Sequence, residues 1–172
     1  MEKLISKEIQ SDLSKLGIYQ IAGGGVGVLM VLLGMYNSEA LTGLTILIFG
    51  FMLVFFGYSI YCGIICITEK KNALGHSLAN QLLQVLGFAI VGFAFKYAAG
   101  LYLTIGLDLT ESFNLKFGTG ISKFELNFNK EVDRVELDFN LVALGLIFWI
   151  EKLRKKVKAE IEFRQVASMG EL

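Results

Sequence analysis

Few side chains in this sequence could do chemistry, and they lie in or next to long apolar segments. Lys96 stands inside an uncharged stretch, and an ionisable group at membrane depth marks a functional site by default because it is costly to bury there. Cys62 and Cys66 are four residues apart, and His76 follows. Zinc needs three or four ligands, so we expect no metal site. A thiol oxidoreductase would use a C-x-x-C pair, whereas the spacing here is C-x-x-x-C.

Other catalytic patterns do not occur in the sequence. The apolar segments hold no Ser/His pairing, paired aspartates or clustered Glu and His that could serve intramembrane proteolysis. The glycine-rich run 23–27 (GGGVG) lacks the lysine and hydroxyl residue of a phosphate-binding loop. We therefore expect no catalytic residue and no cofactor, and we predict that the protein is not an enzyme.

Two interpretations of Lys96 stay open. In the first, Lys96 faces another helix or a narrow cavity, because helical spacing places small residues on its face: Ala89, Gly92, Ala99 and Gly100. Lys96 would there bind an anionic group, stay neutral, or bond to Tyr hydroxyls and backbone carbonyls, since no acidic residue lies in the apolar runs of the predicted spans. In the second, the side chain extends outward to the membrane surface along its four-carbon stem.

The elements that would position these residues are membrane helices. The 172 residues are 54% hydrophobic and 19% charged, with mean hydropathy +0.59, which is too apolar for a soluble domain. The formal net charge is zero, so no overall field attracts nucleic acid. The uncharged runs predict an all-α membrane protein with a single domain, 1–172. It would be a four-transmembrane-helix bundle with spans at about 17–37, 40–67, 82–107 and 137–155.

Glycines are expected to form the packing surfaces of these helices, because small residues let two backbones approach closely. Gly23 and Gly27 form a GxxxG pair in the first span. In the second span, which we expect to be the hub of the bundle, glycines recur every seven residues at Gly43, Gly50 and Gly57. Gly92 and Gly100 would do the same in the third span.

Residues 108–138 break the helical pattern. The segments FNLKF, ISKFELNF and RVELDFN alternate apolar and polar residues with period two, which is typical of strands. We predict a small antiparallel β excursion of three strands outside the membrane, between the third and fourth spans. A helix over 130–139 is the alternative, because Val132, Val135 and Phe139 also fit a 3.6-residue period.

Both ends of the chain carry amphipathic helical patterns. Residues 1–16 fit a helix that lies on a membrane surface or packs under the bundle. The predicted cytoplasmic helical tail, 152–172, holds basic residues that suit anionic lipid headgroups or a stop-transfer flank: Lys152, Arg154, Lys155, Lys156 and Lys158. With four spans, eleven basic residues fall on this side of the membrane and four on the other. The positive-inside rule then predicts an inner (plasma) membrane protein with both termini in the cytoplasm.

The order of these features is a first span with Tyr-Gln-Ile-Ala-Gly-Gly, a long second span, a Lys-bearing connection, a strand-like outer loop and a basic helical tail. It resembles small four-span bacterial membrane proteins of uncharacterised function, a resemblance of architecture that implies no site residue. We expect a non-enzymatic accessory or assembly subunit that contacts membrane lipid and binds other membrane subunits or itself. The alternative is a homo-oligomeric pore or membrane-disrupting effector, with Lys96 near the conduction path.

Overall fold

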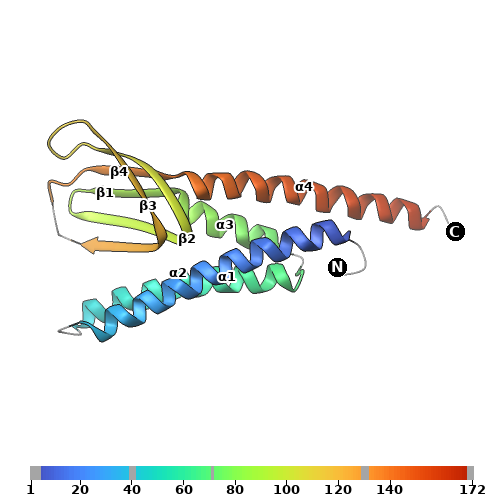
Figure 1. The fold of residues 1–172 in the computed structure, drawn as a ribbon, viewed down its shortest axis with the longest axis horizontal. Helices are drawn as coiled ribbons and strands as arrows, with labels where there is room; N and C mark the ends of the chain where they lie inside the picture. Colours follow the sequence, from blue (N-terminus) through green and yellow to red (C-terminus); the bar gives the residue numbers. More distant parts are fainter. Residues whose placement is uncertain (1–4, 39–41, 71, 129–131, 170–172) are drawn as a thin grey trace.

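The computed structural model describes residues 5–38, 42–70, 72–128 and 132–169, and it is an α+β fold (Figure 1). The elements in chain order are α1 (Lys7–Tyr36), α2 (Gly43–Ile67), α3 (Ala73–Val85), β1 (Leu86–Ile90), β2 (Phe93–Asp108), β3 (Asn114–Phe128), β4 (Glu136–Asn140) and α4 (Leu141–Met169). In the described residues two helices, α1 and α2, are long and apolar enough to cross a membrane. The predicted all-α bundle of four spans, and with it a multi-pass four-helix bundle, is therefore wrong.

The first two predicted spans correspond to α1 and α2, which pack against each other as a helical hairpin (Figure 1). Thr42 begins α2, because its side-chain oxygen accepts a hydrogen bond from the backbone N–H of Thr45 at 3.2 Å. Glycines bring the two backbones together: a Cβ on Gly17 would lie 2.6 Å from the carbonyl oxygen of Gly63. The close contacts of the hairpin are formed by Gly17, Gly24, Gly27 and Gly63, and not by the glycines of the seven-residue repeat.

The third predicted span, 82–107, is mostly β-structure. Helix α3 ends at Val85, and the chain continues as β1 and β2. Val91 and Gly92 have positive φ angles of 49° and 76° and reverse the chain in two residues, so that Ile90 pairs with Phe93. Gly92 is thus a turn residue, not a helix-packing glycine. The run is mostly apolar, and periodicity alone does not separate a buried strand from a buried helix.

The four strands form an antiparallel sheet in which three of them close into a ring. Strand β2 pairs with β3 along one edge, from Phe93–Phe128 to Asp108–Asn114. The other edge of β2 pairs with β1 near its start and with β4 near its end. Strands β1 and β4 also pair with each other, which completes the ring. A bulge at Ala98/Leu101 lets the long β2–β3 hairpin bend around β1 and β4 (Figure 1).

The β excursion is larger than predicted and differently divided. Two of its three predicted strands form one continuous strand, β3, and the third contributes β4. The alternative helix over 130–139 is wrong from residue 136 onward, and residues 129–131 lie outside the described part. The predicted fourth span, 137–155, begins as strand and becomes α4 at Leu141, where the side chain of Asn140 accepts a hydrogen bond from the N–H of Val142 at 3.1 Å. Helix α4 includes the predicted tail up to Met169.

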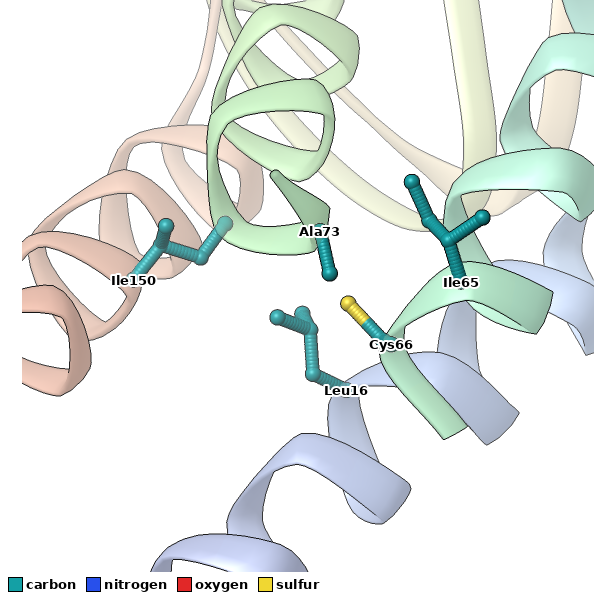
Figure 2. Close-up of a cluster of buried hydrophobic side chains, with 5 residues drawn as sticks. All are labelled: Leu16, Ile65, Cys66, Ala73 and Ile150. Atoms are coloured by element: carbon teal, nitrogen blue, oxygen red, sulfur yellow. The ribbon is translucent and has the colours of Figure 1, made fainter. Parts of the chain in front are cut away.

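Three apolar clusters hold the elements together. Figure 2 shows the first, where one or two residues from each of the four helices meet: Leu16, Ile65, Cys66, Ala73 and Ile150. The second packs Ile5, Ile9 and Leu13 against Leu153 of α4, so the amphipathic N-terminal segment lies against another helix. The third joins the helical hairpin to the sheet, and its buried members are Val31, Phe56, Tyr97 and Ala99.

Candidate functional site

Lys96 lies on β2 and points into the ring of strands, where it is buried. Its Nζ atom is 2.5 Å from Oε2 of Glu136 and 2.6 Å from Oδ2 of Asp138, both on β4. Both open interpretations placed Lys96 on a helix, which is wrong. Its inward position and its anionic partners agree with the first interpretation, and the outward extension of the second is wrong. Glu136 and Asp138 escaped notice because they lie some 40 residues further along the chain, in a segment assigned to the outside of the membrane. The alternation Glu136-Leu137-Asp138-Phe139 indicates a strand with both carboxylates on one face, and it was the sequence pattern that could have identified them.

Glu136 is the centre of a larger network of charges. Besides Lys96, its carboxylate accepts hydrogen bonds from Lys116 and, at 2.8 Å, from Arg134. Lys116 also donates to Asp108 at 3.2 Å, and Arg134 donates to Glu125 at 2.7 Å. Three cations and four carboxylates are thereby linked, and Lys123, 3.7 Å from Glu125, balances the charge. The network is neutral overall and its members neutralise one another.

These contacts keep the central groups ionised. Burial alone would raise the pKa of Glu136, but the hydrogen bonds from Arg134, Lys116 and Lys96 hold that pKa well below its ordinary value. Burial would lower the pKa of Lys96, yet the contacts with Asp138 and Glu136 raise it. A general acid or base works best when its pKa lies near the operating pH, so neither group suits proton transfer at neutral pH. The arrangement fits a structural role.

A small cavity lies beside Lys96 within the ring. Its volume is about 110 Å³, and its lining includes the polar residues Gln84, Lys96, Tyr102, Thr104 and Asp138. Ligand pockets for drug-sized molecules usually have roughly 300–1,000 Å³. The cavity has room for a few water molecules and is too small for an organic substrate of ordinary size.

Helix α3 carries a second set of buried polar groups, which the sequence analysis missed. Its inward side holds Ser77, Asn80, Gln81 and Gln84, each at most 3% exposed. Leu82 and Leu83 face outward and are 56% and 41% exposed. The spacing i, i+3, i+4, i+7 was visible in the sequence, but the segment before residue 82 was interpreted as a polar connection. Helix α3 is thus polar inside and apolar outside.

Hydrogen bonds connect this polar side of α3 to the hairpin and the sheet. Ser77 donates to Oε1 of Gln20 at 3.1 Å, and Asn80 donates to the Ser59 hydroxyl at 3.2 Å. Gln84 accepts the backbone N–H of Ala99 at 2.7 Å. Buried polar groups that are paired in this way fix how elements sit against each other.

The predicted packing glycines differ in what surrounds them. Gly23 lies against the backbone of Ala99 and Gly100, and Gly27 lies against the ring of Phe56, so each fills a contact that leaves no room for a side chain. Gly100 itself has φ +106° and lies against Tyr19, which makes it a strand-bulge residue and not a helix-packing one. The seven-residue repeat of α2, Gly43, Gly50 and Gly57, has nothing within 4 Å of the position a Cβ would take.

The remaining candidates are separate from the ring. Cys62 and Cys66 are free and buried, and Cys66 lies 3.1 Å from the hydroxyl of Ser77. His76 contacts the hydroxyl of Tyr58 at 3.2 Å. Within the described ranges, no three His, Cys, Asp or Glu side chains converge as a metal site would require.

The basic residues predicted to contact lipid headgroups lie on an exposed part of α4. These residues are Lys152, Arg154, Lys155, Lys156 and Lys158. Lys156 pairs with Glu8 at 2.9 Å and so joins α4 to α1, and Arg154 pairs with Glu151 at 2.7 Å.

The chain matches no protein-family model, and no curated protein or solved structure matches it at a significant level.

Proposed function

We propose that this protein is a non-enzymatic membrane protein that acts as an assembly or accessory subunit and is anchored by the α1–α2 hairpin. The observation that carries the proposal is the reversed distribution of polarity. Polar groups of α3 and of the strand ring are buried, whereas α2 and the outer surfaces of α3 and the ring expose leucine, isoleucine and phenylalanine. An apolar outside with a polar inside that is mostly hydrogen-bonded, with the side chain of Gln81 and the Nε2 atom of Gln20 as exceptions, suits a hydrocarbon surrounding, because no water there can satisfy polar groups.

The open face of α2 supports an assembly role. Gly43, Gly50 and Gly57 lie along one side of the helix with empty space in front of them. In lipid, small residues at a helix surface allow another helix to approach closely. We infer that this face receives a helix of another membrane subunit, and the test below detects both a second copy and a different chain.

The charge network supports a non-enzymatic role. Its cations and carboxylates are bonded to each other. The same neutralisation speaks against the pore, since Lys96 is held by two carboxylates and presents no free charge to a passing ion.

We propose an inner-membrane orientation with both ends of the hairpin in the cytoplasm. The turn between the two helices, residues 37–42, contains no Lys or Arg, whereas Lys7 and Lys15 precede the apolar part of α1 and Lys70 follows α2. The positive-inside rule places the turn on the outer side. A reporter of membrane sidedness should be located outside the cytoplasm when it is fused into the turn, and in the cytoplasm when it is fused to the C-terminal tail.

The assembly role is tested by Gly50→Leu, with Gly25→Leu as the matched control. Both glycines have nothing within 4 Å, but Gly25 lies on α1, outside the repeat. In gently solubilised native membranes, we expect Gly50→Leu to release the chain from its complex, and Gly25→Leu to leave the particle mass unchanged. A wild-type particle that contains one copy and no other polypeptide would contradict the proposal.

A further inference from the structure

We propose that the free edge of β3 pairs, antiparallel and within the bilayer, with β3 of a second copy of this chain. The inference rests on the proposed membrane function and names one partner for it. Strand β3 pairs with β2 along one edge over its whole length. Within the described residues no strand pairs with its other edge, whereas β1, β2 and β4 use both edges in the ring.

The position of β3 beside the hairpin determines which groups can form hydrogen bonds with the unpaired backbone N–H and C=O groups of this edge. The Ser122 hydroxyl donates to the carbonyl oxygen of Gly23, near the middle of the apolar part of α1, at 2.8 Å. The ring of Phe124 lies 5.6 Å from that of Phe55, in the middle of α2. If the hairpin crosses a membrane, β3 therefore extends from the middle of the bilayer toward one surface. Water is absent at that depth, and open sheet edges do not occur in hydrocarbon.

The edge has only part of the usual protection against pairing. Soluble proteins guard edge strands with charged side chains, prolines, bulges or short length. Strand β3 is 15 residues long and contains no proline. Its two lysines are held in ion pairs, Lys116 with Asp108 and Glu136 of the ring and Lys123 with Glu125 of the same strand. The side chains that flank the edge on the outer face are apolar and exposed, at 59% for Leu115, 72% for Phe117 and 56% for Ile121.

A second copy is the partner that completes the sheet without creating a new edge. Because the ring leaves β3 as the one free edge in the described part, two chains related by a two-fold axis use up both edges. A different partner strand with a second free edge of its own would again leave an unpaired edge in the hydrocarbon. Two-fold pairing gives a closed dimer and not a filament.

The test is a disulfide scan of the outer face of β3 in a Cys62→Ser/Cys66→Ser background, with purified chain in nanodiscs. Single substitutions Leu115→Cys, Phe117→Cys, Thr119→Cys and Ile121→Cys cover the exposed half of the strand. The matched control is Leu103→Cys, because Leu103 pairs with Thr119 on the same face but lies on β2. Across a β3–β3 junction, the two copies of residue 103 would be three strand spacings, or about 14 Å, apart.

The expected result is a single maximum of disulfide cross-linking along the scanned positions of β3. Residues directly opposite in an antiparallel pair have Cβ atoms roughly 4.5–5.5 Å apart, and each residue away from the two-fold axis adds about 7 Å along the strands. One or two neighbouring scan positions should therefore cross-link, and Leu103→Cys should not. Equal cross-linking at all positions, or none above the control, would overturn the proposal, as would cross-links in native membranes to a different polypeptide only.

The wild-type chain gives a second readout that needs no substitution. Reconstituted alone, it should have the mass of an even number of copies, and a strict monomer would overturn the pairing. Failure of this inference is distinguishable from failure of the proposed function. If the scan is negative while Gly50→Leu still releases the chain from a complex in native membranes, the assembly role stands and only the β3 contact is wrong.

Discussion

Replacing Lys96 with methionine tests whether the charge network is structural. The substitution keeps the length of the side chain but removes its charge. Glu136 retains Lys116 and Arg134, whereas Asp138 loses the cation that it contacts at 2.6 Å. Both side chains are nearly enclosed, at 9% exposure for Lys96 and 12% for Asp138. Removing one partner of a buried pair typically costs about 3–5 kcal/mol, because the other charge stays buried without compensation.

We expect the lower end of this range, about 3 kcal/mol, because half of the Lys96 contacts go to a carboxylate that keeps other cations. For a chain of this size that corresponds to a fall in Tm of roughly 6–12 °C. The assay is thermal unfolding of the protein in nanodiscs, followed by circular dichroism. The double variant Lys96→Met/Asp138→Leu should recover much of the loss, since it leaves no unpaired charge on Asp138.

A double-mutant cycle over these variants measures the coupling between the two residues directly. Additive effects would refute the reasoning, because they would mean that Lys96 and Asp138 do not interact. A Lys96→Met variant with unchanged Tm would refute it as well, and would return Lys96 to the list of functional candidates.

Two further predictions concern the hairpin and pH. Gly27→Ala should lower the free energy of unfolding by about 1–3 kcal/mol, because the added methyl group would overlap the Phe56 ring. Gly25→Ala is the control, because Gly25 faces open space, and it should leave the free energy of unfolding unchanged. Equal unfolding curves for the two variants would contradict the packing of Gly27 against Phe56. The free energy of unfolding should be constant from neutral pH to about 5 and should decrease at pH values below 4.5, the ordinary pKa of a Glu carboxyl. The folded state holds the pKa of Glu136 below that of the unfolded chain, so the stabilisation is complete only where the unfolded chain is also ionised. Glu136→Gln should be less stable at pH 7 and show a shallower acid transition; an acid transition identical to that of the wild type would show that Glu136 is not its cause.

The helical hairpin was predictable because its uncharged runs are long and are separated by a short polar turn. The strands at 114–128 and 136–140 were predictable because polar and apolar residues alternate there. Strand β2 was not, although Tyr102, Thr104 and Gly106 alternate with Leu103 and Ile105. Its polar members are small or aromatic, so the hydropathy of the whole run stayed high and resembled that of a span.

The interior of the ring could not be predicted from local patterns. Lys96 meets Glu136 and Asp138 only because β2 bends at Gly100 and lets its far end pair with β4. That closure depends on a bulge and on pairings between distant segments, which leave no periodic signal. The polar side of α3 was visible in the sequence, but it was interpreted as a solvent-exposed side, because polar residues are usually exposed.

The most direct test of the central claim is the mass of the particle extracted gently from its own membrane into nanodiscs and measured by native mass spectrometry. An assembly subunit predicts a mass that includes at least two copies of the 19.0 kDa chain, or this chain together with other polypeptides. A particle with a single 19.0 kDa chain and lipid alone would contradict the account.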